Sequence, residues 1–181
     1  MDAAISLMRE TQDPQRLTVR QIAERAGVNS ALVSYYYGSK EDLIHAAVDA
    51  ILRAEAGNWL APPDNEADPI KRLKEMLRQM SDMVIGYFQF TKVSLEFALT
   101  QGGAEVAQMI LPLLRAIDPG RDEREVRLLS FVFISGLQSV LVRQETFRSY
   151  TGYDLFDKTQ RDEILDKLVD TIIASPIEKK E

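Results

Sequence analysis

Residues 18–40 read TVRQIAERAGVNSALVSYYYGSK, and the spacing of apolar and turn residues in this stretch decides the fold. Thr18 is a favourable N-cap, and the apolar residues behind it recur at the three-and-four spacing of one helical face. Gly27 then ends this helix, because glycine adopts the left-handed conformation at little cost. Asn29 or Ser30 can cap a second helix. Two short helices joined by a glycine turn predict a helix-turn-helix.

The second helix of this unit has two predicted faces. We expect the inner face to hold Val33, Tyr36 and Tyr37, and the outer face to hold Ser30, Ala31, Ser34 and Tyr35. The outer face almost lacks the Lys and Glu that solvate an ordinary surface helix. An ordinary helical hairpin with small packing residues is the alternative, but this outer face favours a helix that enters the major groove of DNA.

The stretch TVRQIAERAGVNSALVSYYYGSKEDL resembles the N-terminal motif of TetR-family transcriptional regulators, in which an aromatic pair, a small turn and Ser-Lys-Glu precede a long fourth helix. The resemblance implies that Thr18 and Lys40 bond phosphates and that Tyr36 lies against the DNA backbone. The full set of DNA contacts that it implies is Thr18, Arg20, Asn29, Ser30, Ala31, Ser34, Tyr35, Tyr36 and Lys40. Leu32 and Ser34 depart from the commonest family pattern, where a Thr or Ser and a Tyr are usual.

Composition excludes several classes of protein. The chain has 181 residues and is 45% hydrophobic, which is enough for a sizeable core and unlike a disordered protein. It has no Cys and one His, so disulfides and thiolate metal sites are excluded, and we expect no metal and no cofactor. We find no leader sequence and no apolar run as long as a membrane span, and we expect a cytoplasmic protein without a membrane partner.

Charge is distributed unevenly along the chain. The net charge is −6, but residues 1–40 contain five basic and four acidic residues, a net charge of +1. An acidic body with a near-neutral head would present the head to DNA, although so small a positive charge predicts modest nonspecific affinity. Family members often carry a basic arm before the first helix. Either binding is weak here, or the natural chain starts upstream of Met1.

The remaining chain predicts an all-α protein of about nine helices. The first helix spans about 2–11, and a long fourth helix starts after the N-cap Ser39 and runs to about Leu60. A linker rich in Pro and acids follows at 61–69. Further helices continue to the C-terminus, and we expect Pro112 to interrupt one of them. We predict a DNA-binding domain at 1–46 and an effector-binding and dimerisation domain at 47–181.

Two C-terminal helices predict an assembly surface. Residues 128–142 are apolar nearly all round, and the helix at about 159–174 carries a wide apolar stripe. Paired with the same helices of a second copy they would form a four-helix bundle, the dimer interface that the resemblance implies. The predicted interface residues are Val132, Gly136, Val140, Leu165, Leu168 and Ile172. The alternative is that both helices are simply the core of a monomer.

Methionine and aromatic residues gather in the C-terminal part and suit a small apolar effector. The predicted effector residues are Met80, Met83, Tyr87, Phe88, Phe97, Met109, Phe131 and Gln138. The competing interpretation is that these residues are core, which such residues at helical spacing more often are.

An enzyme is not expected, and no catalytic residue is predicted. His45 stands alone, and Gly38-Ser39-Lys40 lacks the upstream glycine of a phosphate-binding loop. The sequence therefore predicts a homodimeric regulator, in particular a repressor, that binds double-stranded DNA at a palindromic operator and is released by a small apolar effector. The alternatives are a DNA-binding dimer without an effector and a protein-interaction module that has lost DNA binding.

Overall fold

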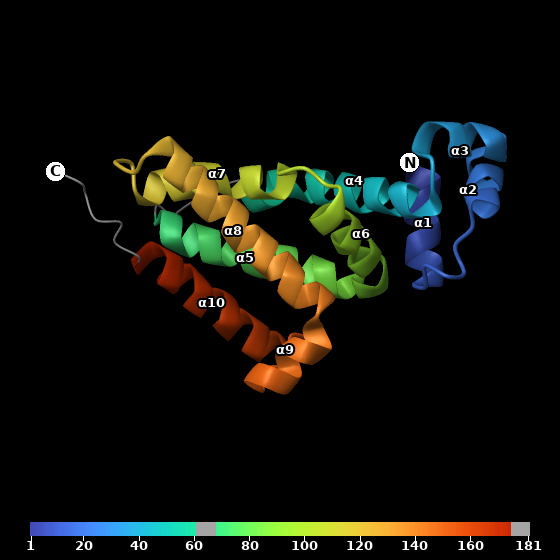
Figure 1. Cartoon of the computed structure of the whole chain (residues 1–181). Coiled ribbons are helices and arrows are strands. Elements are labelled where there is room, and N and C mark those ends of the chain that lie inside the picture. The colour runs from blue at the N-terminus through green and yellow to red at the C-terminus, as the bar shows by residue number, and fades with distance from the viewer. Residues whose placement is uncertain (61–67, 175–181) are drawn as a thin grey trace. The chain divides into compact units, whose positions relative to one another are not determined.

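The computed structural model describes residues 1–60 and 68–174, which form ten helices and no strand (Figure 1). The helices are α1 (Asp2–Thr11), α2 (Val19–Ala26), α3 (Ser30–Tyr37), α4 (Lys40–Leu60), α5 (Pro69–Gly86), α6 (Phe88–Thr100), α7 (Glu105–Ile117), α8 (Glu123–Val142), α9 (Gln144–Thr151) and α10 (Lys158–Ala174). The predicted all-α class is confirmed. Most of the predicted linker, residues 61–67, lies outside the described residues.

The chain divides into two compact units. The first comprises Met1–Gly57 and Met83–Gly103, and the second comprises the rest of the described chain. Helix α5 contributes its last turn to the first unit and its longer part to the second, whereas α6 lies entirely in the first. The predicted domain boundary at residue 46 falls inside α4 and remains a prediction about function.

The first unit has its own core. Short helices such as α2 and α3 bury one or two side chains each, so their stability depends on packing against longer neighbours. α4 supplies the largest share, and Phe90 joins from α6. The buried members are Ala4, Leu7, Met8, Leu17, Ile22, Ala23, Val33, Leu43, Ile44, Ala47, Val48, Ile51 and Phe90.

The second unit packs α5, α7, α8 and α10 around a separate core. Its buried residues are Leu73, Met76, Leu77, Ala107, Ile110, Leu111, Leu113, Leu114, Val126, Phe133, Ile134, Leu165 and Val169. The expected interruption at Pro112 is wrong, because α7 continues through it. Proline removes a single bond to the carbonyl of Gln108, and the core contacts of Leu111 and Leu113 on either side hold the helix together.

A series of ion pairs joins α5 to α10 in the second unit. The pairs are Lys74–Asp170 at 2.6 Å, Arg78–Asp166 at 2.5 Å, Lys158–Asp82 at 2.6 Å and Arg161–Asp82 at 2.5 Å. The basic partners lie on α5 in the first two pairs and on α10 in the last two.

Arg161 differs from the other basic residues of this series because it is buried, at 5% exposure. Its guanidinium also donates to the carbonyl oxygen of Leu155 at 2.7 Å and to Ser81 Oγ at 3.2 Å. Burial alone would raise the pKa of Asp82, but the bonds from Lys158 and Arg161 outweigh it and lower that pKa below its usual value. The buried cation is therefore both paired and hydrogen-bonded, as a buried charge requires.

Helix α8 is longer and more apolar than we expected from the sequence. Among the described helices it is the one that is long and apolar enough to cross a bilayer, by length and composition alone. The expectation that no apolar run reaches that length was therefore wrong. Only 22% of this apolar stretch of α8 is buried within the chain. One face carries Val126, Ser130, Phe133 and Ile134 into the core, and the apolar residues of the other face stay exposed.

Candidate nucleic-acid interface

The turn between α2 and α3 is fixed at both ends by local bonds. Thr18 Oγ1 accepts from the Gln21 N–H at 3.2 Å, and Gln21 Oε1 accepts from the Thr18 N–H at 2.9 Å, which completes a capping box. Gly27 has a φ of 66°, and the N–H groups of Gly27 and Val28 donate to the carbonyls of Glu24 and Ala23. This Schellman ending turns the chain directly into α3.

Helix α3 presents nearly all of its surface to solvent. Asn29 is the N-cap, and its Oδ1 accepts from the Ala31 N–H at 2.8 Å. Val33 is the one buried residue of the helix. Tyr35 is 83% and Tyr36 is 72% exposed, and their rings meet edge to face with centroids 5.6 Å apart. The expected inward position of Tyr36 was wrong.

Helix α4 begins from a second capping box just beyond α3. Ser39 Oγ accepts from the Asp42 N–H at 3.0 Å, and Asp42 Oδ2 accepts from the Ser39 N–H at 3.0 Å and from its hydroxyl at 2.6 Å. These bonds lower the pKa of Asp42. Gly38 before them has a φ of 77°, and a Cβ at this position would lie 3.1 Å from Asp42 Oδ2. Only glycine suits this corner.

The predicted phosphate-binding groups are already engaged in the free protein. Lys40 Nζ donates to the Pro14 carbonyl at 3.1 Å, so two of its three N–H bonds remain for DNA. The Thr18 hydroxyl donates to Gln21 Oε1 at 2.8 Å and must leave this bond to reach a phosphate. Arg20 Nε is bound by Glu24 at 2.8 Å.

Two more basic residues of the first unit are also paired. Arg25 makes a bidentate contact with Glu10 at 2.8 and 2.9 Å, which lowers the pKa of that carboxyl. Arg9 Nε donates to the Tyr87 hydroxyl at 3.2 Å. Arg16 is exposed in the loop before α2, and no contact within the described ranges 1–60 and 68–174 engages its guanidinium. Arg16 was not among the predicted contacts, because nothing in the sequence shows which of the basic residues lack a partner.

The predicted DNA contacts occupy one connected part of the first unit. Eight of the nine are exposed and Lys40 is half-buried. They lie at the start of α2, on the outer face of α3 and at the start of α4, and the bond from Lys40 to Pro14 holds the last of these near the first. The arrangement offers a solvent-exposed short helix flanked by groups that can donate to phosphates.

Comparison with known proteins agrees with this geometry. Residues 1–47 match the family described as "Bacterial regulatory proteins, tetR family". By its N-terminal domain, the chain belongs to the TetR family. It is a DNA-binding transcriptional regulator.

Two relatives and one solved structure give the extent of this similarity. The HTH-type transcriptional regulator BetI of Rhizobium meliloti is 32% identical over 78 residues, covering 43% of this chain and 38% of BetI. The HTH-type transcriptional dual regulator CecR of Shigella flexneri is 28% identical over 178 residues, covering 84% of this chain and 78% of CecR. The structure of TetR-Q116A from Acinetobacter baumannii in complex with minocycline has a TM-score of 0.64 and 22% identity, with 96% of each chain covered.

The eight predicted effector residues of this TetR-family chain are divided between the two units. Met83, Tyr87, Phe88 and Phe97 lie in the first, and Met80, Met109, Phe131 and Gln138 lie in the second. Several have structural partners. Tyr87 accepts the bond from Arg9, and Phe97 packs on His45 with ring centroids 4.5 Å apart. Met80 and Met109 pack against the core of the second unit, and Phe131 is 52% exposed.

His45 has a packing role in the first unit. Its Nδ1 lies 2.8 Å from Ser94 Oγ, so the ring connects α4 to α6. Within residues 1–60 and 68–174, no three His, Asp or Glu side chains are grouped to hold a metal ion.

The predicted dimer residues fall into two groups. Val132 is 59% exposed, Leu168 is 37% exposed, Gly136 is also exposed, and Val140 is half-buried. Leu165 is 5% exposed and belongs to the core of the second unit, against which Ile172 also packs. Leu165 is therefore not available to a partner, because the buried stripe of α10 is used by its own unit.

Proposed function

We propose that this regulator is a homodimeric repressor that binds a palindromic operator and is released by a small, largely apolar effector. The observation that carries the proposal is the α3 surface, which exposes Ser30, Ala31, Ser34 and Tyr35 and buries only Val33. A helix stabilised from one side, with its other sides free of long charged chains, is able to enter the major groove.

The groups around α3 suit two kinds of contact. Side chains on α3 reach base edges and determine sequence preference, whereas Arg16, Arg20, Lys40 and the N-terminus of α2 donate to phosphates and position the helix. Arg16 is the cation of this set that gives up no internal bond on binding DNA. We therefore expect it to contribute more than the paired Arg20.

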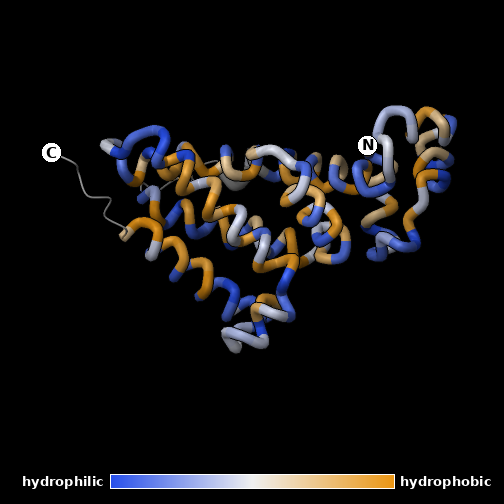
Figure 2. The backbone as a smooth tube through the Cα atoms, viewed as in Figure 1, coloured by the Kyte–Doolittle hydropathy of each residue, from blue (hydrophilic) through white to orange (hydrophobic). Residues whose placement is uncertain are grey.

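The outer face of α8 supports the dimer. Leu128, Phe131 and Val132 are 61%, 52% and 59% exposed, and they follow the three-and-four spacing of one helical face. Gly136 continues this face, where the absence of a side chain permits close approach of another helix. Figure 2 shows apolar residues recurring along α8 and α10. Contiguous exposed apolar residues of this kind indicate an interface.

A charged residue in this face tests the dimer. We expect Val132→Glu to convert a dimer into a monomer in analytical ultracentrifugation and to weaken operator binding, because one short helix reads too few base pairs alone. Leu99→Glu is the matched control, since Leu99 is 40% exposed on α6 in the first unit. A dimer mass in Val132→Glu would reject the outer face of α8 as the interface, and a monomer mass in wild type would reject the dimer.

The proposed effector response rests on a fold-level analogy and on apolar residues of the second unit. The structure of TetR-Q116A from Acinetobacter baumannii, which has the same fold, was solved in complex with minocycline. An effector acts here only if it binds the DNA-competent and DNA-incompetent conformations with different affinity.

Selection of duplexes from a random pool tests DNA recognition. We expect a palindrome to be enriched. On that duplex, Arg16→Ala should weaken binding to every sequence alike and reduce the salt dependence by about one phosphate contact, whereas Ser34→Ala should change the preferred bases. Arg115→Ala removes the same charge from a surface pair in the second unit, and it should change neither the strength of DNA binding nor the preferred bases.

If no duplex were enriched, the interaction-module alternative would replace this proposal. Equal losses for Arg16→Ala and Ser34→Ala on all sequences would show instead that α3 does not face the bases. A dimer that binds its palindrome unchanged in the presence of every small molecule tested would leave the effector-independent alternative.

A further inference from the structure

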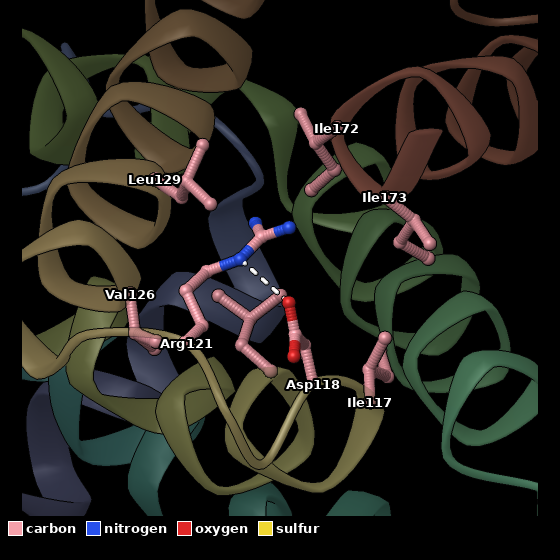
Figure 3. Close-up of a pocket in the computed structure, with 8 residues that line it drawn as sticks. Ile117, Asp118, Arg121, Val126, Leu129, Ile172 and Ile173 are labelled. Carbon is pink, nitrogen blue, oxygen red and sulfur yellow. Dashed lines mark hydrogen bonds and ion pairs between the residues drawn. The ribbon is translucent and has the colours of Figure 1, made fainter. Parts of the chain in front are cut away.

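A pocket of about 170 Å³ lies in the second unit, between the end of α7, the first half of α8 and the last turns of α10 (Figure 3). Its walls include Leu114 from α7, Leu129 from α8, and Ile172 and Ile173 from α10. Two polar side chains, Asp118 and Arg121 from the connection before α8, complete the lining. None of the eight effector residues predicted from the sequence lines this pocket.

Arg121 is held with its guanidinium in this apolar space. Its side chain is 14% exposed, and its Nε donates to Asp118 Oδ2 at 3.0 Å. Figure 3 shows the guanidinium directed between Leu129 and Ile172, away from the Asp118 bond. Within the described part of the chain, no contact engages its two terminal NH₂ groups. The four N–H bonds of these two groups are therefore open to an acceptor that enters the pocket.

We propose that this pocket binds a small carboxylate with a compact apolar body. The guanidinium supplies the planar pair of donors that matches a carboxylate, and the aliphatic walls accept the hydrocarbon. An apolar cavity of about 150 Å³ is known to hold benzene, so the volume here suits a body of about six carbon atoms. The bond from Arg121 Nε to Asp118 leaves the NH₂ edge free, so the ligand need not displace Asp118.

The site deepens the proposed function, because it assigns a place and a chemical class to the effector. Its role as an effector site rests on the proposed function, whereas the binding of a carboxylate does not. Leu129 and Ile172 belong to the same helices whose outer faces carry the exposed Val132 and Leu168. A ligand that separates or tightens these helices from within would change the surface that they offer to a second copy.

Isothermal titration calorimetry with the full chain tests the binding. The probe is sodium hexanoate, compared with hexanol and hexylamine, in the absence of DNA. We expect saturable binding of hexanoate that Arg121→Gln weakens by about tenfold or more, since a bond to a charged group is lost. Asp118→Asn should strengthen binding, because it removes a negative charge beside the ligand carboxylate. Arg115→Gln is the control, since it alters a surface pair of α7 close to the pocket and lines no part of the pocket.

Absence of saturable hexanoate binding by the wild type would overturn the proposal. So would equal affinities in wild type and Arg121→Gln, or preference for hexylamine with loss of binding in Asp118→Asn. Because no DNA is present, such a failure would leave operator binding untouched. A failed duplex selection would in turn leave this ligand site standing.

Discussion

Replacing glycine by alanine at three positions of the first unit should give effects of opposite sign. Gly38 has a φ of 77° and Gly27 a φ of 66°, whereas Gly57 lies within α4 without a positive φ. An added methyl meets Asp42 Oδ2 at 3.1 Å at position 38 and nothing within 4 Å at positions 27 and 57. The same chemical change therefore tests backbone conformation separately from crowding.

The magnitudes follow from these differences. Gly38→Ala adds a strained backbone to a weakened capping box, and should lower the free energy of unfolding by about 2 kcal/mol. Gly27→Ala should cost about 1 kcal/mol from the left-handed conformation alone. Gly57→Ala should raise it by about 0.5–1 kcal/mol, because alanine is the better helix former. These changes correspond to shifts in Tm of roughly 2–4 °C per kcal/mol.

Thermal unfolding by circular dichroism and calorimetry, at one fixed protein concentration, measures the three shifts. We also expect Gly38→Ala to weaken DNA binding, because this corner fixes Lys40 relative to α3. The reasoning would be refuted if Gly38→Ala and Gly57→Ala moved the Tm in the same direction, since φ and the contact at Asp42 would then not determine the outcome.

Three further substitutions test separate features. Asp82→Asn should lower the free energy of unfolding, measured in urea, by about 2 kcal/mol, because Arg161 stays buried without its counter-charge. Glu163→Gln, which alters an exposed ion pair, should change it by less than about 0.5 kcal/mol. Equal losses in the two variants would contradict the role of burial. Because the pKa of Asp82 is lowered, its stabilising effect is present above about pH 4 and disappears as the pH falls through its folded-state pKa, so wild type and Asp82→Asn should converge in acid. Thr18→Ala should cost about 1 kcal/mol in the same urea assay through the lost cap, and no loss would show that the capping box is not formed in solution. Pro112→Ala should raise the Tm, since the exposed proline leaves a helical bond unmade; a lower Tm would mean that the proline makes packing contacts of its own.

Local signals in the sequence predicted the first unit well. The caps Thr18 and Ser39 and the turn at Gly27 act on neighbouring residues, so their geometry follows from the chain itself. The first helix was expected at 2–11 and is α1, Asp2–Thr11. Tyr36 was misplaced because its spacing from Val33 put it on the predicted inner face, whereas the short α3 buries only Val33.

Features that depend on the rest of the protein were not predictable in this way. Helix α9 was missed because none of its residues is buried, so it has no apolar stripe to detect. The wide stripe of α10 did not show that Leu165 faces its own core while Leu168 faces outward. The pocket at Arg121 was also missed, because its walls come from segments more than forty positions apart.

The ion pairs between α5 and α10 do not by themselves select the register of these two helices. Their charged residues repeat every four positions, so a slide of α10 by one helical turn, about 5.4 Å, would bring Lys74 to Asp166 and Arg78 to Asp162 and would let Lys158 keep its present partner, Asp82. Each of these pairs again joins opposite charges, and the number of ion pairs alone would not oppose the slide.

Arg161 breaks this degeneracy. It is the buried member of the series, and its bonds to Asp82 and Ser81 on α5 belong to the observed alignment. A one-turn slide would carry the guanidinium away from both while the exposed pairs re-formed. Among the charged residues of α10, Arg161 is thus the one that distinguishes the observed alignment from a one-turn slide, beside the core contacts of Leu165 and Val169.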